Sequence, residues 1–397
     1  MKNPFADGEH VLYPLSLCAA AACMVSIAAS HILLGAGAAW LLLHRDRVRI
    51  PRVWLPILVF LAATLAAAAF SPAPAAAWPQ IRKFYVWLFL PVVYSGVRRA
   101  SEASLVLAAM AVCGTASALW GLAQFEQKYV GAAARGEDFY QSYVAERITG
   151  FMSHWMTFSS HVMFAFLAAV AFLLLARNRR APVWIFCGGV TAVALVLGFT
   201  RSIWPAAAAG MMFLVWHWRR WFVLATPVAI VALVLFAPEP LNRRIESAWK
   251  PSKLDSNDHR QALRRTGLRM IEAHPLVGVG PEQVGPRFLE FAPPDVPRPL
   301  PSAWYTQHLH NIYIHFAAER GVPAAVGLVW FLALVAWQLG RGAAGVDRAV
   351  PLAAVAAIIG TAVGGYWEVN LGDSEVLGAL LSMIACGYAV RDEEAAA

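Results

Sequence analysis

The chain has 397 residues, of which 59% are hydrophobic and 14% are charged, and its formal net charge is +8. Because an ordinary soluble domain carries about 25% charged residues, this composition excludes a typical soluble protein and predicts one embedded in a lipid bilayer. The positive charge could indicate nucleic acid binding, but the basic residues gather in short connectors between apolar runs, so we interpret them as a topology signal and expect no nucleic acid partner.

Repeated apolar runs predict an all-α fold, a polytopic helical bundle in one integral membrane domain over residues 1–397. The runs do not alternate as barrel strands do, and only helices or closed barrels satisfy backbone groups in lipid. The first run lacks a cleavage site and is expected to be retained. With about 20 residues for each span, we predict about 12 spans. They are residues 11–28, 30–43, 53–70, 80–96, 102–124, 155–176, 182–199, 202–217, 220–236, 312–339, 350–368 and 374–391.

The connectors predict the orientation of these spans. Those that follow the even-numbered spans are basic, as at Arg45, Arg98, Arg177, Arg219 and Arg341. Positively charged connectors stay in the cytoplasm, so both termini are expected there as well. The opposite side then carries two long loops, a first periplasmic loop at 125–154 and a large loop with helices at 237–309.

Two basic sites interrupt this pattern. Arg201 lies in a short connector, Phe199-Thr200-Arg201-Ser202, on the outward side. It is either an arginine that reaches the lipid headgroups or a cation that faces a ligand. Arg82 and Lys83 begin the fourth span, and there we favour an interfacial role.

The first long loop ends in a polar and aromatic stretch from Glu146 to His161. Aromatic residues at this depth usually belong to the interfacial belt. His154, Trp155 and Thr157 would also suit the hydroxyls and ring faces of a sugar, so both interpretations stay open.

The second long loop contains a predicted helix from Asp255 to Ala273, which Ser256 or Asn257 can cap and which ends before Pro275. Its apolar stripe consists of Leu263, Gly267, Met270 and Ile271. At about 100° per residue, Arg260 lies beside the stripe and Arg264 at its edge, whereas Arg265 and Arg269 project to the far side. The glycine-rich segment 275–281 that follows is expected to be a turn, since it lacks the strand and helix of a dinucleotide loop.

The stretch from Trp304 to Gly321 is the densest in chemically active groups. His308 and His315 could be amphipathic anchors at the interface, but His310 stands beside Asn311 where a loop meets a helix, which favours a solvent-reachable site. Residues 308–320 could form an interfacial helix, with Glu319 and Arg320 at the surface, or the outer end of a longer helix, with the two buried and paired.

The outward side thus gathers Arg201, Arg260 and His310, with carboxylates at Glu368 and Asp373. Arginine forks bind phosphate oxygens bidentately, and an imidazole can accept a proton near neutral pH. The outward carboxylates are scattered and the five cysteines lie in apolar spans without metal-type spacing. We therefore expect arginine to stabilise a leaving group, and we expect no metal and no cofactor.

Several short motifs in this order resemble the O-antigen ligase superfamily, which also holds O-antigen polymerases and protein O-oligosaccharyltransferases. They are Thr200-Arg201-Ser202, Arg260 fourteen residues before His274-Pro275-Leu-Val-Gly278-Val-Gly280, His310-Asn311-x-Tyr313 with Glu319-x-Gly321, Arg147-Ile-Thr-Gly150, and Asn370-Leu-Gly-Asp373-Ser374. The agreement covers about the last half of the chain. Thr-Arg-Ser-Ile-Trp stands here where the family often has Ser-Arg-Gly.

The resemblance implies a GT-C-like enzyme of the bacterial inner membrane whose active site faces the periplasm. Such enzymes transfer a glycan from undecaprenyl diphosphate-linked O-antigen to an acceptor, in ligases the lipid A core oligosaccharide. Arg201 and Arg260 would then hold the diphosphate, and His310 would deprotonate or orient the acceptor hydroxyl, with inversion at the anomeric carbon. The candidate substrate-binding residues around them are Arg147, His154, Trp155, Arg264, His308, Asn311, Tyr313 and Asp373.

Three alternatives accompany the ligase. A polymerase or a protein O-oligosaccharyltransferase would use the same donor. We prefer the ligase because one large outer loop carries the arginine helix and because the last outward connector resembles ligases. A secondary transporter would need ionisable groups near the midplane or two related halves with broken helices; the spans carry almost no internal charge and show no repeat.

Overall fold

The computed structural model describes residues 9–176, 181–225, 239–246, 257–302, 304–342 and 348–396, and these contain helices and no strand. The predicted all-α class is therefore confirmed. The α-helices are α1 (Glu9–Ala22), α2 (Ile27–Leu43), α3 (Trp54–Ala69), α4 (Trp78–Arg82), α5 (Phe89–Gly96), α6 (Ala100–Arg135), α7 (Phe139–Ala145), α8 (Trp155–Leu175), α9 (Ala181–Leu197), α10 (Ile203–Arg219), α12 (Glu239–Glu246), α13 (Asn257–Ala273), α14 (Phe288–Phe291), α15 (Ile312–Arg320), α16 (Val322–Gly342), α17 (Ala349–Gly364) and α18 (Ser374–Ala396). Short 3₁₀ helices are η1 (Arg45–Arg47), η2 (Pro74–Ala77), η3 (Lys83–Leu88), η4 (Arg220–Ala225) and η5 (Asn370–Gly372).

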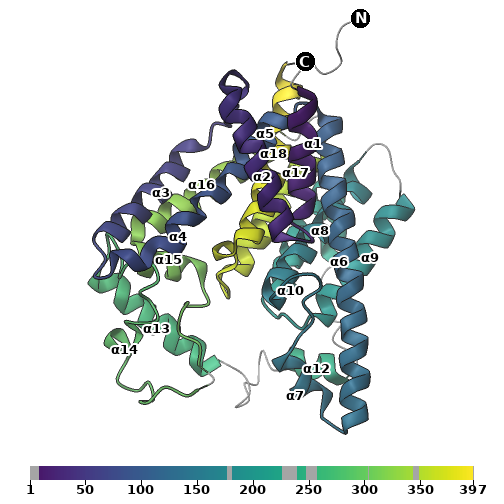
Figure 1. The fold of residues 1–397 in the computed structure, drawn as a ribbon. Coiled ribbons are helices and arrows are strands. Elements are labelled where there is room, and N and C mark those ends of the chain that lie inside the picture. Colours follow the sequence, from purple (N-terminus) through teal and green to yellow (C-terminus); the bar gives the residue numbers. More distant parts are fainter. Residues whose placement is uncertain are drawn as a thin grey trace, which may run out of the picture.

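Four of the described helices, α6, α8, α16 and α18, are long and apolar enough to cross a membrane, and five shorter ones are also apolar. The protein is thus a helical membrane protein; the count of twelve spans stays a prediction. The ninth predicted span, 220–236, lies mostly outside the described residues. Helix α1 begins and α18 ends at the same end of the bundle, and α7, α12 and α13 lie toward the other (Figure 1). The side of the membrane that each end faces stays a prediction.

Helices α8, α17 and α18 form the centre of the bundle. The most apolar stretch of α18 is 83% buried inside the protein, whereas that of α16 is 39% buried. Helix α16 therefore leaves much of its surface to lipid. Where α10 crosses α17, a Cβ on Gly210 would lie 2.8 Å from the carbonyl oxygen of Ala356. The two backbones therefore approach closely, as small residues allow between membrane helices.

The fourth predicted span, 80–96, is not one continuous helix. It consists of α4, the 3₁₀ helix η3 and α5. The Lys83 ammonium in η3 donates to the carbonyl oxygen of Gly372 in η5 at 3.0 Å, and Val86 and Trp87 are buried. Tertiary contacts thus override the α-helical expectation, and Lys83 points to the bundle rather than serving only as an interfacial cation.

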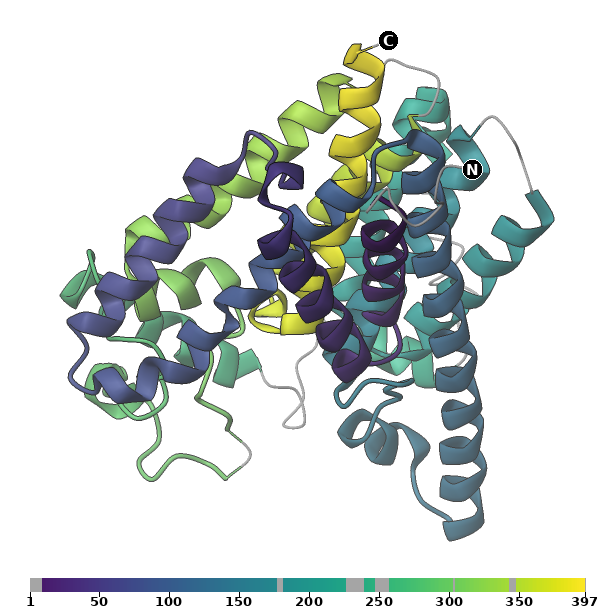
Figure 2. The same ribbon diagram turned by 45° about the horizontal axis from the view of Figure 1, so that its top comes forward.

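Helix α6 is longer than the predicted span 102–124. Its 36 residues reach about 54 Å at 1.5 Å per residue, well beyond a hydrocarbon core of about 30 Å. The prediction ended at 124 because Glu126, Gln127 and Lys128 do not suit lipid, yet they are good helix formers in water. The helix stops at Gly136, which adopts a left-handed φ of 65°. Its outer end projects past its neighbours (Figure 2), so much of 125–154 is helical rather than loop.

Helix α13 occurs where the sequence predicts it, and Ser256, one of its expected caps, lies outside the described residues. Its predicted stripe is buried at Leu263 and Met270 and packs with Leu309 into a second hydrophobic core. A Cβ on Gly267 would lie 2.6 Å from side-chain atoms of Leu309 and Ile314, so this small residue lets α13 lie close to α15.

The glycine-rich segment after α13 is a turn, as predicted, and it clamps the end of α15. The amides of Val279 and Gly280 donate to the carbonyls of Ala318 and Glu319 at 2.8 and 3.0 Å. Gly278 has a φ of 65°, and a Cβ there would lie 2.4 Å from the carbonyl carbon of Glu319. Only glycine fits this contact.

For residues 308–320 the sequence leaves open a separate helix with Glu319 and Arg320 at the surface, or the end of a longer helix with the two buried and paired. The structure combines a separate helix with a buried pair. Gly321, with a φ of 84°, separates α15 from α16. Glu319 and Arg320 are nevertheless buried, and they pair at 2.8 Å. Arg320 also donates to Gln80 at 2.7 Å, so the charged pair ties α15 to α4.

Candidate functional site

The arginines of α13 divide as their helical phase predicts. Arg260 donates to the carboxylate of Glu368 at 3.0 Å, on the connector between α17 and η5. Arg264 is exposed and donates to the Tyr366 hydroxyl at 3.2 Å. Arg265 pairs with the exposed Asp295 at 2.6 Å, and Arg269 is also exposed. Arg260 is therefore the arginine of this helix that faces the bundle.

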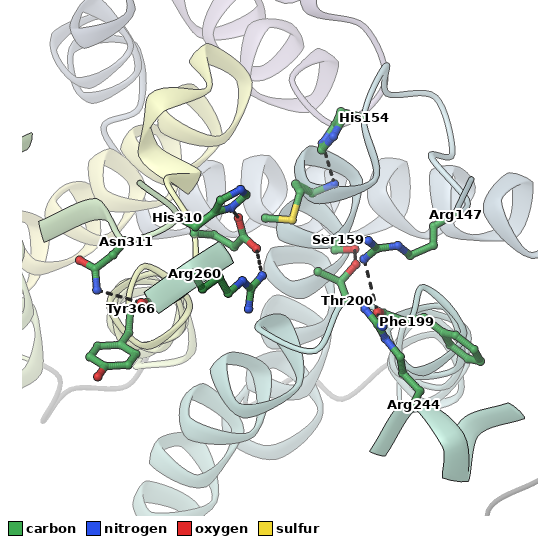
Figure 3. A network of polar contacts seen from close by, with 12 residues as sticks. Arg147, His154, Ser159, Phe199, Thr200, Arg244, Arg260, His310, Asn311 and Tyr366 are labelled. Carbon is green, nitrogen blue, oxygen red and sulfur yellow. Dashed lines mark hydrogen bonds and ion pairs between the residues drawn. The ribbon is translucent and has the colours of Figure 1, made fainter. Parts of the chain in front are cut away.

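His310 shares the carboxylate that holds Arg260. Its Nδ1 lies 2.9 Å from Oε2 of Glu368, while Arg260 occupies Oε1 (Figure 3). The carboxylate side chain is only 6% exposed, against 23% for His310. If Nδ1 carries the proton and donates it, Nε2 is the acceptor atom. A buried acid thus fixes the orientation of a solvent-reachable imidazole.

The backbone at His310 supports this geometry. Its φ of 47° is in the left-handed region, which is uncommon for a residue with a side chain. Asn311 caps α15 by accepting from the amides of Tyr313 and Ile314, and its amide group donates to the Tyr366 carbonyl at 2.9 Å. The Tyr313 hydroxyl donates to Ala362 at 2.7 Å. These contacts give Asn311 and Tyr313 positioning roles beside the site.

Further histidines surround His310. The ring centre of His308 lies 4.3 Å from that of His310, and its Nδ1 is buried without a hydrogen-bond partner among the described residues. Burial, and then the charge of His310, lower the pKa of His308 to about 2. His259, next to Arg260, contacts the Tyr305 carbonyl at 2.9 Å. Burial lowers its pKa to about 4. Both rings are therefore neutral at physiological pH.

A second group of basic residues converges on the carbonyl of Phe199. Arg147 and Arg244 donate to this oxygen at 3.4 and 2.9 Å from different segments (Figure 3). The Thr200 hydroxyl is hydrogen-bonded to the Ser159 hydroxyl of α8 at 2.9 Å, and Arg201 follows two residues before α10 begins. We name Arg147, Arg201 and Arg244 the arginine cluster.

The other two members of the arginine cluster act on the charge of Arg147. Burial lowers the pKa of Arg147 to about 9, and the charges of Arg244 and Arg201 act in the same direction. The charge of Glu368 acts against them, so Arg147 also lies within electrostatic range of the His310 side. Such a concentration of positive charge favours an anion, above all one with several phosphate oxygens.

Two aromatic residues, His154 and Trp155, and one acid, Asp373, complete the surroundings of the site. Trp155 lies under the Arg147 guanidinium at 4.7 Å, and His154 caps α8 by accepting from the Met156 amide. Asp373 accepts from the Thr157 hydroxyl at 2.8 Å, and burial raises its pKa. Burial lowers the pKa of His154, on which Asp373 and Arg147 also act in opposite directions. The segments before α8 and α18 therefore meet at the same place.

The structure brings most of the predicted site residues together. It also gives Glu368 a place in the site and adds two residues, Arg244 and His259. Sequence reasoning noted Glu368 as an outward carboxylate but gave it no role. Ionisable residues in apolar spans are rare and usually functional, so the position of Glu368 at the end of such a span could have indicated its role. Arg244 was not considered, although a helical phase puts it beside the buried Leu241. No local sequence signal distinguishes His259, the neighbour of Arg260, as a site residue.

Comparison with known proteins agrees with the chain's own features. Residues 189–329 match the family model described as O-Antigen ligase. The match contains Arg201, Arg244, Arg260 and His310 and leaves out Arg147 and Glu368. No curated protein matches the chain. Residues 189–329 are thus similar to the O-antigen ligase family, and this match supports an O-antigen ligase family for the chain.

Proposed function

We propose that the protein is an O-antigen ligase of the bacterial inner membrane, which transfers a glycan from undecaprenyl diphosphate to the lipid A core on the periplasmic side. The observation that carries the proposal is the Glu368 carboxylate, which holds Arg260 and His310 on its two oxygens at 3.0 and 2.9 Å. The arrangement puts a proton acceptor beside a cation. In glycosyl transfer from a diphosphate, a proton acceptor can activate the acceptor hydroxyl and a cation can stabilise the diphosphate that leaves.

His310 acts on the acceptor. Its Nδ1–H donates to Glu368, and its Nε2 takes the proton of an acceptor hydroxyl. The oxygen of that hydroxyl attacks the anomeric carbon of the donor glycan, and Glu368 stabilises the imidazolium that forms, as an orienting carboxylate does in other histidine bases. The buried carboxylate is thus the group that lets this imidazole gain a proton.

The arginines act on the leaving group. The bond from the anomeric carbon to the diphosphate oxygen breaks, and its electron pair goes to the diphosphate. Arg260 uses one of its five N–H donors on Glu368, which leaves others for phosphate oxygens. Arg201 and the rest of the arginine cluster supply further charge where the negative charge develops. Direct displacement from the opposite face would invert the anomeric configuration.

Transfer by the purified protein tests the proposal. Wild type is mixed in liposomes with undecaprenyl diphosphate-linked glycan and lipid A core, with chelator present, and compared with His310→Ala and Arg260→Ala. Arg265→Ala is the matched control, because Arg265 lies on the same helix and pairs with the exposed Asp295. We expect ligated lipopolysaccharide from wild type and from Arg265→Ala, and its loss in the other two variants.

The same mixture separates the alternatives. A wild type that lengthens the donor glycan and ignores the core is a polymerase, and one that glycosylates added acceptor protein is a protein O-oligosaccharyltransferase. Full activity in folded His310→Ala and Arg260→Ala would show that the site is elsewhere.

A further inference from the structure

A groove of about 620 Å³ lies beside the arginine cluster, between the outer end of α6, α7 and the segment that leads into α8. Its volume is within the range of about 300–1,000 Å³ that is typical of small-molecule sites. Arg147 and Trp155 line it on one side, and Gln127, Lys128, Ser142 and Ser153 supply polar groups elsewhere. The groove therefore shares residues with the candidate site and extends away from it.

Its walls are held in place by aromatic packing. Phe139 of α7 lies between Phe125 and Tyr129 of α6, with ring centres 5.4 and 5.0 Å away, and stacks on Tyr143 at 5.0 Å. Arg243 of α12 pairs with Asp138, the cap of α7, at 2.7 Å. Helix α7 is thus fixed to the projecting part of α6, and the space between them is a built feature.

A single amide fixes the other wall. The Gln124 carbonyl oxygen accepts from the amides of Thr149 and Gly150 at 3.0 and 2.9 Å, and its amide group donates to the Gly150 carbonyl at 3.0 Å. A Cβ on Gly150, whose φ is 56°, would lie 2.5 Å from the Phe158 ring. The segment that carries Arg147 and Ser153 is therefore pinned to α6.

The groove's chemistry suits a carbohydrate better than a polyanion. Lys128 lies 3.6 Å from Glu146, and Arg135 pairs with Glu137 at 2.7 Å, so much of the local charge is balanced. Apart from Arg147 at the end shared with the candidate site, what remains are hydroxyls, an amide and the apolar area of Phe139 and Trp155. Hydroxyl partners together with an apolar surface are what a sugar ring needs.

We propose that this groove binds the oligosaccharide part of a substrate, beyond the end that reacts. The proposal rests on the function proposed above, which offers two sources of oligosaccharide: the donor glycan and the core acceptor. Arg147 belongs both to the arginine cluster and to the lining of the groove, so a chain whose reacting end lies at the cluster can reach the groove. The volume of about 620 Å³ leaves room for sugars past the first.

Two pairs of neighbouring substitutions test the groove. Ser142→Trp fills it, and Gln141→Trp adds the same bulk one position away, at an exposed residue that does not line it. Gln127→Ala removes one hydrogen-bonding group, and the exposed Glu126→Ala is its control. Loss of one or two such hydrogen bonds corresponds to about a tenfold change in KM. We expect this for one substrate in Ser142→Trp and Gln127→Ala, with kcat at saturation unchanged.

Titration of donor at fixed acceptor, and the reverse, identifies which substrate enters the groove. Saturation-transfer NMR with lipid-free O-antigen oligosaccharide and with delipidated core oligosaccharide measures binding without catalysis. We expect one of them to bind wild type and Gln141→Trp but not Ser142→Trp. The proposal is overturned if wild type binds neither oligosaccharide, or if Ser142→Trp matches wild type in binding and in both KM values. If wild type binds an oligosaccharide but does not transfer the glycan to the core, the ligase function is refuted and the proposed oligosaccharide site is retained.

Discussion

Replacing Glu368 with glutamine keeps the shape of the side chain but removes the charge that joins Arg260 to His310. Two effects follow for the mechanism proposed above. The imidazolium that would form during transfer loses its counter-charge, and the new amide group can donate to Nδ1, which would leave the ring proton on Nε2. In that mechanism Nε2 has to accept a proton, so the variant holds the wrong tautomer.

The size of the first effect can be worked out from the contacts. Two unit charges 4 Å apart interact by about 4 kcal/mol at an effective dielectric constant of 20. Because the side chains of His310 and Arg260 are 23% and 30% exposed, solvent screening reduces this to about 2 kcal/mol, or about 30-fold in rate. A carboxylate-to-amide change that fixes the wrong tautomer lowers kcat by about 10⁴ in a serine protease triad. We therefore expect kcat to fall between about 30-fold and 10⁴-fold.

The assay is ligation with both substrates varied, and Glu272→Gln, an exposed acid on α13, is the control. Removing one partner of a buried ion pair can cost about 3–5 kcal/mol of stability. Thermal unfolding in detergent must therefore accompany the kinetics, together with the double variant Arg260→Gln/Glu368→Gln. A folded Glu368→Gln protein that keeps more than half of the wild-type kcat would refute the reasoning.

Three other outcomes concern stability and are measured by thermal unfolding in detergent. Asn311→Ala should lose about 1–2 kcal/mol with the cap of α15, and Asn311→Asp should lose less because it keeps the acceptor; equal losses would contradict the capping role. Gly278→Ala should destabilise far more than Gly136→Ala, since both have a positive φ but only Gly278 also meets backbone within 3 Å; similar effects would mean that the clash is relieved. Because the pKa of His259 is lowered to about 4, its neutral form stabilises the fold in full above about pH 6.5, and this contribution is lost as the pH falls toward 4. His259→Gln should flatten that part of the stability profile, and an unchanged slope would contradict the burial of this ring.

Periodicity predicted α13 and its phase because a surface helix must bury one face. The spacing of the buried residues Leu263 and Met270 marks that face in the sequence. It failed at α6 because apolarity marks where lipid ends, not where a helix ends. It failed at 80–96 for the opposite reason: the run is apolar throughout, but contacts such as that of Lys83 with Gly372 decide its winding.

The site shows a similar division. The residue types of Arg260 and His310 suggested their chemistry, and helical phase placed Arg260 toward the bundle. The bridge through Glu368 joins positions 58 and 108 residues apart in the chain. No local pattern encodes such a contact. Arg244 and Arg147 meet at the Phe199 carbonyl only because three distant segments fold together.

The attachment of α15 to the end of α17 has a consequence for how the enzyme adapts to its substrates. The Ile312 amide donates to the Gly365 carbonyl at 2.8 Å, and Asn311 donates to Tyr366, two residues from Glu368. The histidine and its carboxylate are thus both attached at the end of the central helix α17. Under the proposed function, His310 would then be the fixed reference against which the acceptor is aligned, and adjustment to substrates of different size would come from the arginine cluster.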